Sequence, residues 1–277
     1  MAEETDSKLT QFKNSVTNLG SSTQGYGDAT LMRFLIARSM DSDKAAKMFV
    51  QWRKWRETMV PNGFISDSEV PDELETRKIF LQGLSQDMFP LMIVQACRHF
   101  PSKDQNQFKK FIVHLLDKTI ASAFKGREVG NEKLIGVLDL QNISYKNVDA
   151  RGLITGFQFL QVIFHLFFVD IFVSNINANI SSHASLLVES QSYYPERLAK
   201  CYILHMPWFF VSVWRLVSGF LDKATQEKIV IISNEDERKE FINEVGEEIL
   251  PEEYGGRAKL VAIQDFEVTP LENGRTN

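Results

Sequence analysis

The chain has 277 residues, of which 44% are hydrophobic and 24% are charged, and this composition excludes a chain that is disordered throughout. Its formal net charge of −5 excludes a protein that binds nucleic acid through a broadly basic surface. The N-terminus carries no apolar leader and no run of about 18 uncharged apolar residues follows, so we expect a cytoplasmic protein without a spanning helix. Cys97 and Cys201 form no CxxC pattern, so neither a disulfide scaffold nor a metal site is expected.

The first 75 residues divide into a polar lead and a small helical lobe. Residues 1–27 are polar and end in a Gly/Ser patch, so we expect them to be disordered. Residues 28–75 are expected to form the lobe, with one helix over 28–38 and a second helix that Asp41 or Ser42 caps. The apolar residues of the second helix follow a 3.6-residue period: Ala45, Met48, Phe49, Trp52, Trp55 and Met59.

The opposite face of that second helix is basic, with Arg53, Lys54 and Arg56. Such a face is either solvated or a patch that binds anions or a membrane. The spacing alone favours a solvated face.

Residues 76–265 are expected to alternate between strands and helices, which indicates a second, α/β lobe. Apolar runs predict buried strands over 90–96, 134–140, 200–205 and 229–232, and a short strand near 260–263. Helices are predicted over 72–84, from a Ser102–Gln105 capping box to Gly126, and over 148–161, 207–221 and 235–249. Fold class α/β with a largely parallel sheet follows from this order, and residues 266–277 form a polar tail.

No familiar catalytic signature occurs in the chain, so its candidate polar sites come from position alone. Asp139 ends a predicted buried strand, where either a functional role or a turn role is open. Glu196 and Arg197 immediately precede one predicted strand, and Lys228 precedes the next. Opposite charges beside an apolar run suit a polar headgroup at the lip of an apolar pocket, although spacing alone favours an ordinary surface salt bridge.

The predicted helix over 207–221 is apolar on almost every side. It is therefore either fully buried or in contact with something apolar that is not this protein, such as lipid.

Six segments together resemble the CRAL-TRIO lipid-binding family, in its phosphatidylinositol/phosphatidylcholine transfer type. They are LMRFLIARSMD (31–41), RHFP (98–101), VLDLQNIS (137–144), YYPERLAK (193–200), the segment 205–232 and LPEEYGG (250–256). The resemblance covers roughly residues 28–265. It implies a helical lobe before an α/β lobe, with one lipid held in an apolar pocket under a gate helix that swings out at the membrane. No bond is made or broken, so the resemblance implies no enzyme and no cofactor beyond the bound phospholipid.

The resemblance also assigns roles to individual residues. It implies that Arg38 and Lys228 face the phosphate of phosphatidylinositol, that Thr225 donates to it, and that Glu196 orients the cations or an inositol hydroxyl. The implied gate falls within 208–228, with the apolar residues Trp208, Phe209, Phe210, Trp214 and Phe220.

Two positions depart from the founding members of the family. Ser39 stands where they carry a second basic residue, which implies weaker affinity for phosphate. Leu134 and Gly136 stand where they carry hydroxyl side chains for a choline headgroup, so we expect phosphatidylcholine to be a poorer ligand or none.

Residues 162–191 interrupt the resemblance, because the family runs almost directly from FQFLQ into SYYPERL. These thirty residues contain no Lys, Arg, Gly or Pro, and half of them are Phe, Ile, Leu or Val. A folded surface insertion should be polar and rich in turn residues. One hypothesis is a retained intron translated in frame, since every Val codon begins GT and a Gln codon can end in AG. The competing hypothesis is a membrane-seeking loop beside the gate.

The leading interpretation is a monomeric cytoplasmic protein that binds phosphatidylinositol or a related phospholipid and contacts membranes transiently. Three alternatives stay open: a carrier of another apolar ligand such as a tocopherol or retinoid-like molecule, a hydrolase that uses Asp139, and an inactive splice product.

Overall fold

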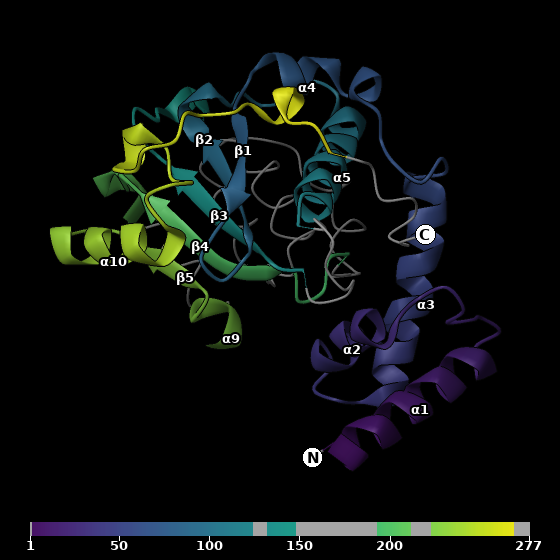
Figure 1. The fold of residues 1–277 in the computed structure, drawn as a ribbon. Helices are drawn as coiled ribbons and strands as arrows, with labels where there is room; N and C mark the ends of the chain where they lie inside the picture. The colour runs from purple at the N-terminus through teal and green to yellow at the C-terminus, as the bar shows by residue number, and fades with distance from the viewer. Residues whose placement is uncertain (1, 124–131, 148–192, 212–222, 269–277) are drawn as a thin grey trace.

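A five-stranded sheet organises the larger part of the molecule (Figure 1). The structure is a computed structural model, and it describes residues 2–123, 132–147, 193–211 and 223–268. The strands are β1 (Ile79–Leu84), β2 (Pro90–Gln95), β3 (Leu134–Asp139), β4 (Leu198–Leu204) and β5 (Ile229–Ile231). They lie in the order β1-β2-β3-β4-β5; β1 and β2 are antiparallel, and the other three pairs are parallel. The predicted α/β fold with a largely parallel sheet is therefore confirmed.

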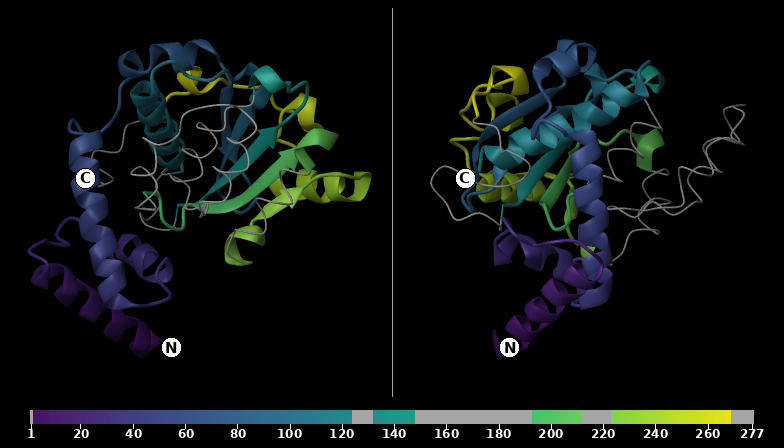
Figure 2. Two further views of the ribbon diagram at one scale, coloured as in Figure 1. Left: turned by 180° about the vertical axis from the view of Figure 1, so that it is seen from behind. Right: turned by 90° about the vertical axis from the view of Figure 1, so that its right-hand side faces the viewer.

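Apolar side chains alternate between the two faces of this sheet, as a strand that is buried on both sides requires. Leu81 and Met92 contribute to the core under α5 (Gln105–Ala121), whereas Phe80, Leu91 and Ile93 contribute to the core under α10 (Glu235–Val245). The two helices accordingly lie on opposite sides of the sheet (Figures 1 and 2).

The N-terminal helices form a separate lobe below the sheet in Figure 1. They are α1 (Ala2–Asn18), α2 (Asp28–Ile36) and α3 (Ser42–Met59), and α3 extends from this lobe toward α5, where Arg56 pairs with Asp117. Asp41 caps α3, because its side chain accepts from the backbone N–H of Lys44 at 3.0 Å. The sequence prediction of that helix is confirmed.

The prediction that residues 1–27 are disordered is wrong. Leu9, Phe12 and Val16 recur every three or four residues along α1, and all three are buried in the core of the helical lobe. The ring of Phe12 meets that of Phe49 edge to face, with centroids 5.8 Å apart. The polar composition of the segment concealed a narrow apolar stripe, and tertiary packing of that stripe orders the helix.

The predicted helix over 72–84 is also wrong. Only α4 (Pro71–Glu75) is helical there; Arg77 adopts a left-handed φ of 46°, and β1 begins two residues later. Pairing with β2 overrides the local helical pattern, because the segment gains a ladder of backbone hydrogen bonds, which an irregularity interrupts between Leu81 and Leu84.

Several element ends differ from prediction. Asp104 rather than Ser102 caps α5, since its carboxylate accepts the N–H groups of two residues in the first turn. Helix α10 ends at Val245 because Gly246 takes a φ of 99°. The expected strand near 260–263 is a single bridge between Phe80 and Ala262. Phe266, placed in the polar tail, packs against the core beneath α5. The predicted helix over 148–161 and the segment 162–191 lie outside the described residues.

Candidate functional site

Polar residues gather at one edge of the sheet, where three neighbouring parallel strands begin. Glu132 precedes β3, Glu196 and Arg197 precede β4, and Lys228 precedes β5. Because parallel neighbours start at the same edge of a sheet, segments far apart in the sequence come together there.

Glu196 lies in a turn that two aromatic residues hold in place. The ring of Tyr193 stacks on Trp55 of α3 with a centroid distance of 4.0 Å. The buried hydroxyl of Tyr194 donates to Asp117 of α5 at 2.7 Å, and Arg56 of α3 donates to the same carboxylate at 2.8 Å. Burial, and then the neighbouring Asp117 carboxylate, raise the pKa of Tyr194 well above its usual value.

The turn itself adopts an uncommon backbone conformation. Glu196 has a φ of 54°, in the left-handed region that non-glycine residues rarely occupy. Its carboxylate accepts from Lys228 Nζ at 3.3 Å, and both side chains are about three-quarters buried, with 21% and 25% exposed. The two residues that the sequence places beside neighbouring strands therefore meet in one ion pair. Their role toward a headgroup stays a prediction.

Arg197, the residue after Glu196, belongs to a buried cluster of two arginines and one glutamate. Arg197 Nη1 donates to the backbone carbonyl of Glu132 at 2.7 Å and also to its carboxylate. Arg33 of α2 places its Nη1 atom 3.7 Å from the same carboxylate, and its Nε and Nη1 atoms have no hydrogen-bond partner among the described residues. Burial, and then the charge of Arg197, lower the pKa of Arg33. The cluster holds one more positive charge than negative charge in a desolvated place.

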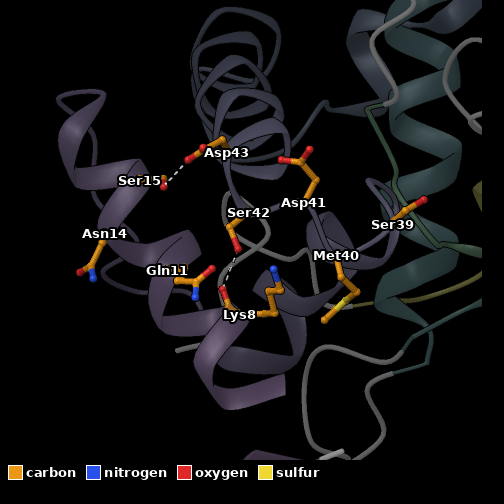
Figure 3. A pocket seen from close by; sticks show the side chains of 9 residues that line it. All are labelled: Lys8, Gln11, Asn14, Ser15, Ser39, Met40, Asp41, Ser42 and Asp43. Atoms are coloured by element: carbon orange, nitrogen blue, oxygen red, sulfur yellow. Dashed lines mark hydrogen bonds between the residues drawn. The ribbon is translucent and has the colours of Figure 1, made fainter. Parts of the chain in front are cut away.

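Arg38 lies farther along the same N-terminal segment. It is half-buried, burial lowers its pKa, and its Nη1 donates to the carbonyl oxygen of Ala37 at 2.9 Å. Ser39, where the family carries a second basic residue, is exposed and has a left-handed φ of 51°. It lines an open polar groove of about 600 Å³ between α1 and the turn before α3 (Figure 3).

The remaining predicted site residues are described only in part. Residues 208–211 are helical; Trp208 is 82% exposed, whereas Phe210 is buried against Leu140 and Ile203. The other gate residues, Trp214 and Phe220, lie outside the described residues, as does the side chain of Thr225, whose backbone belongs to α9 (Lys223–Gln226).

Asp139 takes the turn role that the sequence left open. Its Oδ1 accepts from the backbone N–H of Gln141 at 2.9 Å and contacts His205 Nδ1 at 2.8 Å, and its Oδ2 accepts from the hydroxyl of Tyr254 at 3.0 Å. The side chain thus joins the ends of β3 and β4 to the LPEEYGG segment. Within the part of the chain that the structure describes, no group of three or more His, Cys, Asp or Glu side chains could hold a metal ion.

The basic face of α3 is occupied inside the protein. Arg53 donates to the carbonyl of Ser22 at 2.7 Å, and Arg56 is buried in the ion pair with Asp117. Only Lys54 of the three is left exposed. Arg53 therefore holds the connection between α1 and α2 inside the helical lobe, and Arg56 joins that lobe to α5, so the two do not form an external anion patch.

Sequence reasoning missed Arg33 and Glu132. The signal for Arg33 was a charged residue within an apolar stripe, since Leu31, Phe34 and Leu35 flank it on the buried side of α2. Glu132 precedes an apolar strand in the same way as Glu196, and no local pattern separates it from a solvated residue.

Comparison with known proteins identifies relatives over most of the chain. Residues 74–189 and 173–256 match the CRAL/TRIO domain, and together they cover well over half of the chain. The CRAL-TRIO domain-containing protein YKL091C of Saccharomyces cerevisiae is 28% identical over 94% of this chain and 80% of its own length. The Sec14 cytosolic factor of Schizosaccharomyces pombe is 25% identical over 86% of this chain and 77% of its own. An Arabidopsis thaliana protein, phosphatidylinositol/phosphatidylcholine transfer protein SFH9, is 24% identical over 93% of this chain and 42% of its own.

A solved structure has the same fold. The crystal structure of Sfh5 superposes with a TM-score of 0.57 and 16% sequence identity, over 92% of this chain and 80% of that chain. Among the described residues, no helix is both long enough and apolar enough to cross a membrane.

Proposed function

This chain belongs to the CRAL/TRIO domain family, and on that premise we propose that it binds one phospholipid and transfers or presents it between membranes. Relatives named as phosphatidylinositol/phosphatidylcholine transfer proteins and as cytosolic factors support this proposal. The protein works as a cytoplasmic monomer that visits membrane surfaces, and it catalyses no reaction.

The headgroup that we propose is phosphatidylinositol. The observation that carries this choice is the excess of buried positive charge around Arg33, Glu132 and Arg197, at the sheet edge where Glu196, the residue before Arg197, pairs with Lys228. A phosphate that approaches this edge of the sheet would supply the missing negative charge and accept from unpartnered guanidinium N–H groups. A tocopherol or retinoid-like ligand carries no phosphate and would leave that charge uncompensated.

Phosphatidylcholine is the weaker candidate in this proposal. Leu134 is fully buried in the core under α5, and Gly136 lies opposite Cys201 in the parallel ladder. Neither position offers a hydroxyl group to a choline headgroup.

The test is mass spectrometry of the lipid that co-purifies with the full chain and with the chain lacking residues 162–191. We expect phosphatidylinositol in both, and about tenfold less of it with Lys228→Ala, because a hydrogen bond between charged groups contributes about 1.5–3 kcal/mol. Lys54→Ala, an exposed lysine on the other lobe, is the control. Phosphatidylinositol in the shortened chain alone would indicate that the inserted segment blocks the site. Absence of any phospholipid from both chains would refute the proposal.

A further inference from the structure

The opposite edge of the sheet, where the parallel strands end, carries a second assembly of chain segments. Residues 97–103 follow β2, residues 140–147 follow β3, and residues 205–211 follow β4. Since β2, β3 and β4 are parallel neighbours, these three segments emerge side by side.

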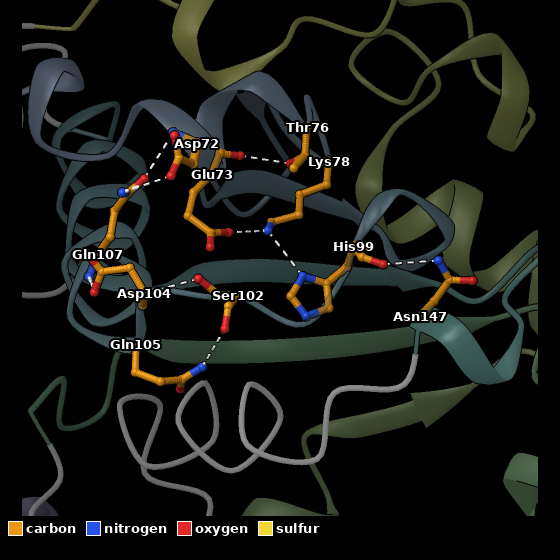
Figure 4. Close-up of polar contacts among 10 residues, drawn as sticks. All are labelled: Asp72, Glu73, Thr76, Lys78, His99, Ser102, Asp104, Gln105, Gln107 and Asn147. Carbon is orange, nitrogen blue, oxygen red and sulfur yellow. Dashed lines mark hydrogen bonds and ion pairs between the residues drawn. The ribbon is translucent and has the colours of Figure 1, made fainter.

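Buried polar contacts hold the first two segments together. Asn147, which is 3% exposed, donates through Nδ2 to the carbonyl oxygens of Cys97 at 2.9 Å and His99 at 3.0 Å. The ring of His99 lies 3.1 Å from the buried Lys78 Nζ, which is paired with Glu73 (Figure 4). The hydrogen bonds of Asn147 therefore connect the segment after β3 to the segment after β2.

Aromatic stacking joins the third segment to the second. The ring of Tyr145 stacks on Phe209 with centroids 5.0 Å apart and planes 29° apart. Ile143 and Met206 pack beneath this stack against the buried cluster that includes Leu140.

Each of the three segments also carries one aromatic side chain that is exposed to solvent. Trp208 is 82% exposed, Tyr145 is 75% exposed and Phe100 is 50% exposed. Lys146 places its Nζ 5.8 Å from the centroid of the Phe100 ring. Exposed aromatic side chains from three segments thus lie on one surface, next to the buried cluster that includes Leu140.

The charge of this surface is one-sided. The three segments contain Arg98, Lys103 and Lys146 and not one Asp or Glu, in a chain whose net charge is −5. All three cationic side chains are exposed. The exposed Asp104 follows Lys103, but within the three segments themselves every charged side chain is cationic, which favours a negatively charged partner.

We infer that this aromatic–basic patch, defined as Phe100, Tyr145, Trp208, Arg98, Lys103 and Lys146, is the surface that the protein lays on an anionic membrane. Trp and Tyr suit the boundary between headgroups and acyl chains, because one end of each side chain is apolar and the other is polar. Lys and Arg beside them attract the headgroups of anionic lipids. Phe100 and Tyr145 lie outside the proposed gate, whereas Trp208 belongs to it and Tyr145 stacks on its Phe209. The inference deepens the proposed function, because it names the surface through which a lipid would be exchanged.

Vesicle co-sedimentation of the full chain tests this inference. We expect binding to phosphatidylcholine vesicles that contain phosphatidylserine, weaker binding to phosphatidylcholine alone, and a loss of binding as salt concentration rises. Lys146→Glu should weaken binding to the anionic vesicles at least about fivefold. The pair Phe100→Ser and Tyr145→Ser, both outside the proposed gate, should weaken binding to both kinds of vesicle about tenfold or more.

Two matched variants control for unspecific effects. Phe64→Ser removes another exposed aromatic ring, 41% exposed and outside the patch, and Lys54→Glu makes the same charge reversal on α3. Both should bind vesicles as the unaltered chain does, and all variants should retain its melting temperature. The inference is overturned if the unaltered chain binds neither vesicle, if the patch variants bind as it does, or if the controls lose binding equally.

The lipid content of each variant separates this inference from the proposed function. The patch variants should co-purify with the same phospholipid as the unaltered chain, because the patch lies at the other edge of the sheet from Glu196 and Lys228. Absence of co-purified phospholipid would refute the proposed function and leave the vesicle result unaffected.

Discussion

Replacing Glu132 with Gln perturbs the buried cluster at the beginning of β3. The Glu132 side chain is 5% exposed, and the Arg33 and Arg197 side chains beside it are 9% and 10% exposed. Gln has nearly the same shape as Glu but no charge, so the substitution leaves Arg33 and Arg197 without the carboxylate that pairs with both of them. Removal of one partner from a buried ion pair costs about 3–5 kcal/mol. We therefore expect Glu132→Gln to lower the free energy of unfolding by about that amount, and the melting temperature by on the order of 10 °C.

Arg33→Met is the matched perturbation from the other side of the cluster. Arg33 leaves Nε and Nη1 unpartnered among the described residues, and its carboxylate contact of 3.7 Å is long. Met fills a similar volume without a charge, and Arg197 keeps its own contacts to Glu132. We expect a loss of no more than about 1 kcal/mol, because little favourable interaction is removed and one desolvated charge disappears.

Urea unfolding of the lipid-free chain, followed by circular dichroism, measures both variants and the double variant. The double variant should be more stable than Glu132→Gln alone, since it carries one buried cation rather than two. The reasoning fails if Arg33→Met costs as much as Glu132→Gln, or if Glu132→Gln costs less than about 1 kcal/mol.

Three further predictions concern other parts of the structure. Phe12→Ala should lower the free energy of unfolding by about 3–5 kcal/mol in the same urea assay, because the side chain is fully buried in the helical lobe; a loss near zero would mean that α1 does not pack there. The pKa of Tyr194 is raised in the folded chain, so its contribution to stability is complete below the pKa of an unfolded tyrosine, about 10, and is lost as the pH rises above it. Tyr194→Phe should therefore show a shallower loss of stability above about pH 10 than the unaltered chain, and an unchanged slope would contradict the burial of this hydroxyl. Burial raises the pKa of the Cys201 thiol to about 12, so this residue should resist N-ethylmaleimide at pH about 8 until urea unfolds the chain; peptide mapping that finds rapid labelling of Cys201 in the folded chain would refute this.

The sheet was predictable because its strands are short continuous apolar runs. The prediction over 90–96 matches β2, and the predictions over 134–140, 200–205 and 229–232 match β3, β4 and β5 to within a few residues. Strands that are buried on both faces carry this signal whatever their tertiary neighbours are. In β1 the run is interrupted by Gln82 and Gly83, and the same residues also fit a helical period, so only pairing with β2 decides the conformation.

The meeting of Glu196 and Lys228 was predictable for the same reason, because each residue directly precedes a predicted strand. Their partners behind the sheet edge were not predictable. Arg33 lies about 100 residues before Glu132 in the chain, and Arg56 lies far before both Asp117 and Tyr194. Ion pairs of this kind depend on how the helical lobe docks, which no local periodicity encodes.

The two arginines of the helical lobe also bear on how this fold could be divided or recombined. The side chains of Arg33 and Arg56 extend from the helical lobe and form ion pairs with Glu132 and Asp117 of the α/β lobe. A fragment that began after α3 would retain Glu132 and Asp117 but lack the arginines that pair with them. We therefore do not expect the α/β lobe to be stable when it is expressed alone from near residue 75. A chimaera of this α/β lobe with the helical lobe of another protein would need both arginines at these two positions. Helices α2 and α3, which carry these arginines, are therefore coupled to the α/β lobe through buried ion pairs. We expect the two lobes to unfold in a single cooperative transition rather than one after the other.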